Sequence, residues 1–321
     1  MKEFLIGSND ANQRLDKFVL KAAKNLPQAL LYKYIRLKRI KVNSKRSEIA
    51  YRLCEGDNVQ MYLNDEFFAE GEASFLTAPA QVDVIFEDEN LLIVDKKPGL
   101  VVHEDDEGTA DTLIARILHY LYNKGEYDPE VENSFAPALC NRLDRNTGGI
   151  VIAAKNAPAL RILNEKIKER EIQKNYLCIV HGRMEQKAGT LEGFLEKDKG
   201  ERKVYIHEKQ QKGDLAVKTK YRVLGESGPL SLLEAELITG RTHQIRAHFA
   251  SIGHPLLGDG KYGTNELNRP YGLKSQALYA YKVSFDFKSD ADILNYLKGK
   301  TFEVNDVWFA REFYNGKISK K

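Results

Sequence analysis

Hydrophobic residues recur at helical spacing in two short segments close to the N-terminus. Residues 14–22 place Leu15 and Phe18 on one face, and residues 28–38 place Leu31 on an inner face. Both segments predict amphipathic helices, because a period of about 3.6 residues gathers such positions on one side. Two short strands are expected to follow the helices, at residues 39–43 and 59–63. Two helices and strands within so short a segment are typical of a small docking module.

The pattern changes after residue 80, where short hydrophobic runs and alternating segments predominate. Strands are predicted at residues 82–86, 91–94, 149–153, 176–180, 216–224, 232–238 and 277–287. Helices are predicted at residues 109–122 and 157–170. Many strands with few helices between them indicate an α+β domain on a mixed, mainly antiparallel sheet. Residues 289–321 lie beyond these patterns and are expected to cover an edge of the sheet.

The periodicity breaks down at residues 66–80, where Gly71, Pro79 and small side chains accumulate. Such residues favour turns and irregular structure, so this segment is interpreted as a connection. A chain of 321 residues has room for one large domain and a small one. We therefore expect a small α/β domain at residues 1–70, a linker at 71–80 and a larger domain at 81–321.

Composition indicates a globular protein with a substantial core. Hydrophobic residues make up 42% of the sequence and charged residues 30%. No stretch approaches the roughly 20 apolar residues that cross a bilayer, and the N-terminus lacks the pattern of a secretory signal. Cys54, Cys140 and Cys178 form no C-x-x-C pair and are expected to be buried, reduced thiols. We expect a cytoplasmic monomer that does not bind membranes.

The charge is distributed unevenly along the chain. The net charge is +3, but residues 1–70 hold 13 Lys and Arg against 9 Asp and Glu, whereas the remainder holds 36 against 37. The segment from Lys33 to Arg46 contains seven basic residues and no acidic one. Clustered cations release counterions when they meet a phosphate backbone, so this segment is a candidate contact for nucleic acid. A solvated basic face explains the same charges equally well.

One carboxylate in the larger domain has the setting of a nucleophile. Asp144 stands between Arg142 and Arg145 in the segment NRLDRNTGG at 141–149, directly before a predicted buried strand. An opposite charge nearby favours the ionised carboxylate, which a nucleophile needs. A simple ion-paired turn is the more common meaning of such a motif.

A second polar cluster, TGRTHQIRAH at residues 239–248, carries Arg241 and Arg246. Thr242 is predicted to cap a helix that ends at Gly253. The inner face of this helix is expected to consist of Ile245, Phe249 and Ile252. The two arginines cannot both lie on that buried face, so either is available to pair with a carboxylate in a bidentate manner.

Two other functions of this region are weighed and set aside. His243, His248 and His254 suggest a metal site, but the first two are five residues apart and would not share a helix face. No H-E-x-x-H motif is present, and GDGK at residues 258–261 lacks the pattern of a phosphate-binding P-loop. We therefore expect neither a metal nor a cofactor.

Four separated motifs together resemble the RluA-like family of RNA pseudouridine synthases, the ribosomal large-subunit type, in that family's order. They are DKKPGLVVHED at 95–105, NRLDRNTGGIVIAAK at 141–155, IQKNYLCIVHG at 172–182 and TGRTHQIRAHFASIGHPLLGDGKYG at 239–263. The N-terminal segment is similar to the S-four-type RNA-binding domain through RLDKFV, YIRLKRIKVN and a late EGD. The family usually has His, Asp and Ser where this sequence has Asn141, Asn146 and Gly148.

The resemblance implies roles for individual residues. Asp144 would be the nucleophile and Arg246 its ion-pair partner. Tyr176 would pack against the target base and take or relay a proton, and Arg142 would fill the space that the flipped base leaves. Phosphate contacts in the N-terminal domain would come from Arg36, Lys38, Arg39 and Lys41.

The reaction implied is the isomerisation of uridine to pseudouridine in structured RNA, by base flipping and covalent attack from Asp144. The adduct could form at the sugar or at the base ring. Ribosomal RNA of the large subunit is the favoured substrate, and transfer RNA is the alternative. A catalytically inactive RNA-binding or ribosome-assembly factor is the main competing function. A glycoside hydrolase would need a second carboxylic acid near the first, where the motifs supply arginine.

Overall fold

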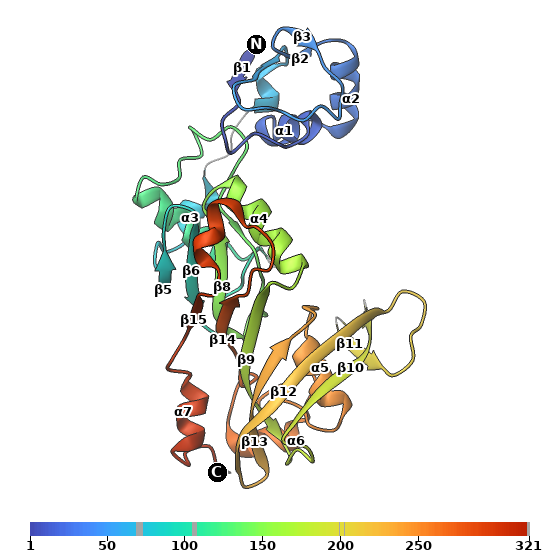
Figure 1. The fold of residues 1–321 in the computed structure, drawn as a ribbon, viewed down its shortest axis with the longest axis vertical. Coiled ribbons are helices and arrows are strands. Elements are labelled where there is room, and N and C mark those ends of the chain that lie inside the picture. The colour runs from blue at the N-terminus through green and yellow to red at the C-terminus, as the bar shows by residue number, and fades with distance from the viewer. Residues whose placement is uncertain (69–72, 105–107, 199, 202, 320–321) are drawn as a thin grey trace.

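The computed structural model of the protein describes residues 1–68, 73–104, 108–198, 200–201 and 203–319. Within these ranges the strands form two separate sheets, one of four strands and one of eleven. Figure 1 shows the small sheet at one end of the long axis and the C-terminal helix α7 (Trp308–Tyr314) at the other. No helix in the described ranges has the length and apolar character that a bilayer crossing requires.

The N-terminal unit packs two helices against a four-stranded antiparallel sheet. Its strands follow the order β1-β4-β2-β3. Its elements are β1 (Lys2–Leu5), α1 (Leu15–Ala22), α2 (Gln28–Arg36), β2 (Ile40–Val42), β3 (Lys45–Arg46) and β4 (Asn58–Met61). Leu15, Phe18 and Leu31 are fully buried in its own hydrophobic cluster, so the inner faces that the sequence predicts are confirmed. This cluster contains no residue beyond Phe68 among those described.

The large sheet follows the order β11-β10-β12-β13-β9-β14-β8-β6-β5, with β7 added to β8 and β15 to β14. Its pairs are antiparallel apart from β14 and β8, so the predicted mixed, mainly antiparallel α+β fold is confirmed. The strands are β5 (Val84–Glu87), β6 (Leu91–Lys96), β7 (Ala138–Leu139), β8 (Gly148–Ala154), β9 (Ile172–His181), β10 (Ala188–Asp198), β11 (Lys203–His207), β12 (Leu215–Ser227), β13 (Leu230–Leu237), β14 (Leu278–Phe285) and β15 (Thr301–Glu303).

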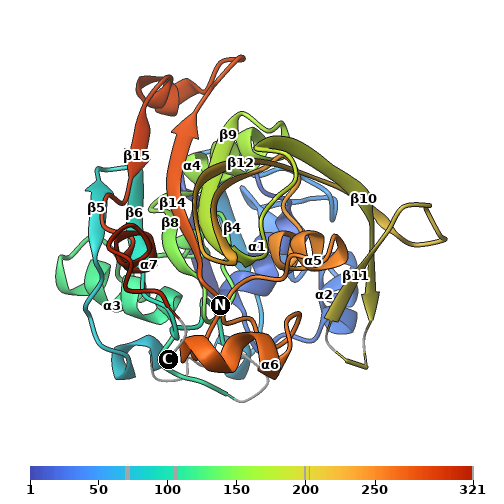
Figure 2. The same ribbon diagram turned by 90° about the horizontal axis from the view of Figure 1, so that it is seen from below.

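Helices cover the large sheet and complete its core. They are α3 (Leu113–Asn123), α4 (Ala157–Lys168), α5 (Gln244–Ser251) and α6 (Asn265–Asn268), with 3-10 turns η2 (Ser74–Thr77), η3 (Arg269–Tyr271) and η4 (Asp292–Leu297). The 3-10 turn η1 (Asp65–Phe68) belongs to the N-terminal unit, because Phe68 packs in its cluster. Figure 2 shows α5 on the inner side of the curved strands β10 and β12. Close contacts of α5 with β11 and β12 agree with this view.

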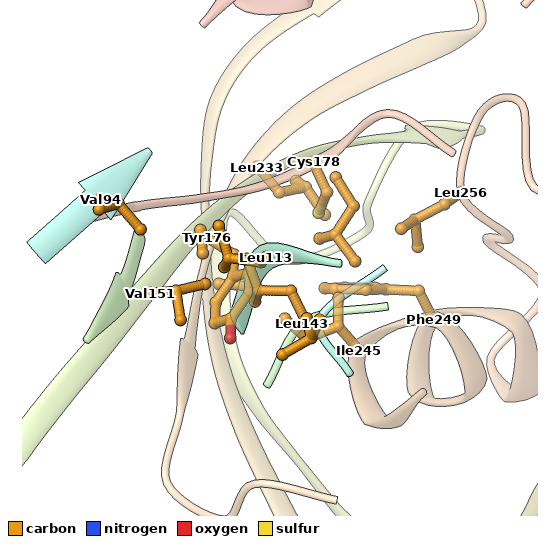
Figure 3. Packing of buried hydrophobic residues seen from close by; sticks show 14 of the residues in the cluster. Val94, Leu113, Leu143, Val151, Tyr176, Cys178, Leu233, Ile245, Phe249 and Leu256 are labelled. Atoms are coloured by element: carbon orange, nitrogen blue, oxygen red, sulfur yellow. The ribbon is translucent and has the colours of Figure 1, made fainter. Parts of the chain in front are cut away.

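One hydrophobic cluster joins the elements on which the candidate site depends. Leu143, Tyr176, Ile245 and Phe249 belong to it, although they come from a loop, from β9 and from α5. Figure 3 shows these side chains in one packed group with residues from other strands of the sheet. Leu143 precedes Asp144 and Ile245 precedes Arg246, so this core holds the backbone on which both polar side chains stand.

The helix around Arg246 ends as predicted, with Ile252 as its C-cap and Gly253 next to it at φ 82°, but its start and its inner face differ from the prediction. Thr242 does not cap it: His243 occupies the N-cap with a left-handed backbone (φ 54°) and forms no capping bond with its side chain. The turn is closed instead by Arg241 and Gln244: the Gln244 side chain accepts the Arg241 N–H, and the Gln244 N–H donates to the Arg241 carbonyl, each at 3.1 Å. At the other end Ile252 is 42% exposed, because the helix ends before that residue can turn toward the core.

Two expectations for less regular regions are wrong in part, those for the cysteines and for the C-terminal region, and the linker stays a prediction. Of the cysteines only Cys178 is buried; Cys140 is half-buried, and Cys54 is exposed in a turn where its backbone N–H donates to Asp57. The predicted linker extends into residues 71–72, outside the described ranges, but its remainder packs against α3 through Phe75. The C-terminal region adds β15 to the inner strand β14, because β8 pairs with β14 over only two residues and leaves its edge open.

Candidate active site

Asp144, Tyr176 and Arg246 are far apart in sequence and line one cleft of about 550 Å³. Asp144 lies in the loop between β7 and β8, Tyr176 on β9, and Arg246 on α5. Arg142 also lines this cleft, and its side chain is exposed. The structure thus brings together the four residues of the larger domain to which the sequence assigned roles.

The loop that carries Asp144 is held from several sides. Leu143 is 9% exposed, and the Thr147 N–H donates to the Asp144 carbonyl at 3.0 Å. The Arg145 carbonyl accepts from the Lys96 ammonium and from the Gly99 N–H, each at 2.9 Å. With Leu143 buried and the carbonyls of Asp144 and Arg145 bonded, the loop presents the Asp144 side chain to the cleft in a defined position.

Arg246 bridges two carboxylates with its guanidinium group. Its Nη1 donates to Asp144 Oδ2 at 2.8 Å, while Nε and Nη2 donate to the two oxygens of Asp259 at 2.7 and 2.9 Å. Asp259 has no exposed surface, whereas the Asp144 side chain keeps 26%. Burial alone raises the pKa of Asp259, but the Arg246 cation outweighs it and holds that pKa below its usual range. Asp259 therefore orients Arg246, and Arg246 in turn holds the accessible carboxylate.

Tyr176 is almost completely buried beside this pair, with 6% of its surface exposed. Burial, and after it the negative charge of Asp144, raise the pKa of its hydroxyl. The phenol therefore stays protonated at neutral pH. It can take up a proton only while it passes its own proton on.

Three further side chains at the site were not assigned a role from the sequence. They are Lys96, His243 and Asp259. Lys96 is 1% exposed and bonds three backbone carbonyls, and burial lowers its pKa to about 8 against the opposing effect of Asp144 and Asp95. Asp259 and His243 were visible only as parts of a glycine-rich segment and of a histidine cluster. No spacing rule links them to Asp144, because their approach depends on how α5 packs against the sheet.

Two departures from the family pattern have local explanations. The Asn141 side chain donates to the Ile150 carbonyl and accepts from the Ile152 N–H, which ties the start of the loop to β8. At Gly148, a Cβ atom would lie 2.4 Å from the Tyr279 ring, so a serine here requires that ring to move. Neither departure alters a residue with an assigned catalytic role.

The histidines considered as metal ligands do not converge. His248 contacts the Thr219 hydroxyl, and His254 contacts a backbone carbonyl on β9. In the part of the chain that the structure describes, no three His, Cys, Asp or Glu side chains are grouped to hold an ion. His243 instead faces the cleft, with its Nε2 3.8 Å from Asp144 Oδ2.

The basic residues of the N-terminal unit form a separate feature, outside the cleft. Arg36, Lys38 and Arg39 are exposed and Lys41 is half-buried. Helix α2 ends in a turn with a left-handed Lys38 (φ 60°), where the Arg39 N–H donates to the Tyr34 carbonyl at 2.9 Å. This reversal after a helix directs consecutive cationic side chains into solvent.

Comparison with known proteins agrees with this geometry. Residues 90–251 match the family model described as RNA pseudouridylate synthase. The chain is 32% identical to an "uncharacterized RNA pseudouridine synthase" of Mycoplasma capricolum, over 97% of this chain and 100% of that protein. It is 30% identical to the ribosomal large subunit pseudouridine synthase C of Salmonella typhi, over 92% of this chain and 91% of that protein.

Solved structures show the same fold. Human RNA pseudouridylate synthase domain containing 4 aligns with a TM-score of 0.56 at 20% identity, over 73% of this chain and 92% of that one. Human RNA pseudouridylate synthase domain containing 1 aligns with a TM-score of 0.52 at 19% identity, over 79% and 99%. The chain belongs to the RNA pseudouridylate synthase family and is an RNA pseudouridine synthase, an isomerase that converts uridine into pseudouridine in RNA.

Proposed function

We propose that Asp144 is the nucleophile of this isomerisation, with Arg246 and Tyr176 acting beside it. The observation that carries the proposal is the contact of 2.8 Å between Arg246 Nη1 and Asp144 Oδ2 at the base of an open cleft. Arg246 holds one carboxylate oxygen, which leaves the other to approach the substrate. The volume of the cleft, about 550 Å³, suits a single flipped nucleoside.

In the reaction, the bond between C1′ of the ribose and N1 of the uracil breaks and a bond between C1′ and C5 forms. C5 loses a proton and N1 gains one, so the mass does not change. Asp144 bonds covalently to the sugar or to the ring in between. Tyr176 packs against the base, and its protonated hydroxyl suits it to relay the proton that leaves C5.

The target uridine must leave its stack before it can reach Asp144, at a cost of about a few kcal/mol. Arg142 stands exposed at the same cleft, where its guanidinium group can fill the space that the flipped base leaves. A planar cation of this kind stacks on neighbouring bases and contacts phosphates, which offsets part of the cost.

We further propose that residues 1–70 are an RNA-binding domain of the S-four type, that 71–80 link it to the rest, and that 81–321 are the catalytic domain. In the N-terminal domain, the phosphate contacts come from Arg36, Lys38, Arg39 and Lys41. The exposure of this basic turn supports the assignment. The enzyme acts in the cytoplasm and as a monomer. Light scattering of the purified protein tests the monomeric state.

The proposed substrate is ribosomal RNA of the large subunit, and transfer RNA is the alternative. Support comes from the Salmonella typhi relative, whose name specifies the ribosomal large subunit. A catalytically inactive assembly factor would have no need of Asp144, Tyr176 and Arg246 together in one cleft.

Pseudouridine mapping of total RNA from cells with and without this protein tests the proposal. We expect one or a few pseudouridines of large-subunit ribosomal RNA to disappear with the protein and to return with the wild-type chain. If a pseudouridine of a transfer RNA disappears instead, the substrate is transfer RNA and not ribosomal RNA. An unchanged map would contradict the proposed substrates altogether.

A further inference from the structure

His243 holds a backbone conformation that only a supporting environment maintains. It is the N-cap of α5 and has φ 54° and ψ 15°, which residues other than glycine seldom adopt. The Gln244 side chain accepts from the Arg241 N–H at 3.1 Å and donates to Thr219 Oγ1 at 3.0 Å, which locks the turn to β12. Such residues gather at functional sites, so this geometry calls for an account of what the imidazole does.

The hydrogen bonds around Tyr262 favour one tautomer of the His243 ring. The Tyr262 hydroxyl oxygen accepts from the Val204 N–H at 3.0 Å and lies 2.9 Å from His243 Nδ1. With its oxygen already accepting, Tyr262 can donate its own proton to Nδ1. The neutral imidazole then carries its proton on Nε2, the nitrogen that faces Asp144 Oδ2 at 3.8 Å.

The surroundings keep this ring neutral near pH 7. Burial lowers the pKa of His243 below its usual value of 6.5, and the cations Arg246 and Lys261 lower it further. Asp144 and Asp259 act in the opposite direction without overcoming burial. A neutral imidazole with Nε2–H is a donor and not a counter-ion, so it adds no second cation beside the nucleophile.

We propose that His243, oriented by Tyr262, is a positioning residue that directs the Asp144 carboxylate toward the substrate. This inference rests on the proposed function of Asp144. Arg246 Nη1 and His243 Nε2 both face Asp144 Oδ2, the first at 2.8 Å and the second at 3.8 Å. Fixing Oδ2 in this way sets the rotation of the carboxylate and turns Oδ1 to the reacting carbon.

Single-turnover assays on a transcript that contains the mapped uridine test the role. His243→Ala is expected to lower the rate of pseudouridine formation by about a hundredfold, as for a misplacement of about 1 Å, with RNA affinity unchanged. His243→Gln, whose amide places an N–H near the former Nε2, is expected to recover most of the rate. Tyr262→Phe keeps the ring 5.2 Å from the Arg246 guanidinium but loses the orienting hydroxyl, so it is expected to be slowed as well.

The pH profile separates positioning from mere support of the fold. In the wild type the rate falls on acidification as His243 gains a second proton, and this inflection is absent in His243→Gln. Equal loss of rate in the Ala and Gln variants, with an unchanged acidic inflection, would show a structural role only and overturn the proposal. A His243→Ala rate within twofold of wild type would overturn it too.

Nitrogen NMR of the histidine rings gives a readout that does not depend on turnover. The proposal requires the Nε2–H tautomer for His243 at neutral pH and a loss of that preference in Tyr262→Phe. A dominant Nδ1–H tautomer in the wild type would contradict the proposal even if the enzyme is active. A wild-type protein that forms no pseudouridine while its His243 has the required tautomer would instead overturn the proposed function.

Discussion

Arg246 uses three guanidinium nitrogens on two carboxylates, one of them without exposed surface and the other open to the cleft. The buried carboxylate of Asp259 also accepts the Lys261 N–H at 2.9 Å, so it has donors on more than one side. Asp259 therefore fixes the position of Arg246, whereas Asp144 faces the cleft and can meet the substrate. Removing the arginine therefore affects stability and chemistry through different partners.

Arg246→Ala is expected to destabilise the protein by about 3–5 kcal/mol, because it leaves the Asp259 charge buried without its main partner. Urea denaturation measures the loss. Adding Asp259→Asn should recover part of the stability, since the unpaired charge is then gone. The rate of pseudouridine formation should fall more than RNA affinity does. An Arg246→Ala variant as stable as wild type would show that the buried pair contributes little.

At this scale the sequence identified the residues that carry distinctive chemistry within family motifs. Asp144, Tyr176 and Arg246 were named in advance, and the structure brings them into one cleft. Asp259 and His243 were missed as partners, because their contacts join α5, the loop of Asp259 and the loop of Asp144 only after folding. A single sequence does not show which distant residues come into contact in the folded protein.

At the scale of elements, the loop with Asp144 enters β8 through two glycines that let β8 approach β14. Gly149 has φ 116°, and a Cβ there would lie 2.2 Å from the Ala280 carbonyl oxygen. Backbone atoms cannot yield as a flexible side chain can. The closeness of β8 and β14 sets the position of the loop end, and hence of Asp144, relative to Tyr176 on the neighbouring strand β9.

Gly149→Ala is therefore expected to lower the free energy of unfolding by more than about 2 kcal/mol, from backbone strain and the clash together. Gly260→Ala is the matched control, because a Cβ at that position meets nothing within 4 Å. Thermal and urea unfolding of both variants measure the difference. Equal stability of the two variants would contradict the close approach of β8 and β14.

The sequence predicted the buried strands well and missed β10 and β11, which have few buried positions. β8 is buried at each of its positions and reads as a continuous hydrophobic run. β10 is largely exposed and contains Gly189 and Gly193, which weaken a strand pattern. Gly193 is needed there because a Cβ would lie 2.6 Å from the Ile206 side chain on β11. The reason for that glycine lies in a neighbouring strand, which the local sequence cannot reveal.

On the scale of the whole molecule, the N-terminal unit contacts the rest through polar side chains. Asp10 accepts from Asn133 at 2.8 Å and from the Ser134 hydroxyl at 2.5 Å. The Asn9 side chain accepts from the Ala157 N–H, the first residue of α4, at 3.0 Å. Polar interfaces of this kind are typical of domains that can separate. The large unit should therefore stay folded without residues 1–70.

Deletion of residues 1–70 is expected to weaken RNA binding and its dependence on salt while slow catalysis remains. If four phosphate contacts are lost, the slope of log affinity against log salt should decrease by about 3. Filter binding over a range of salt concentrations measures it. Neutralising Lys298 and Lys317, two exposed lysines of the C-terminal region, is the control and should have little effect. If the truncated protein binds RNA with unchanged affinity, the basic turn does not contribute to RNA binding.

The central claim is that one carboxylate performs the chemistry, and Asp144→Asn tests it most directly. The amide keeps the size of the side chain and an oxygen for Arg246, so RNA affinity should stay within about twofold, as is usual for isosteric changes outside a binding hot spot. Pseudouridine formation in a single turnover should fall by more than about a thousandfold. Asn146→Asp, a change at an exposed neighbour, should retain activity. Substantial pseudouridine formation by Asp144→Asn would contradict the account.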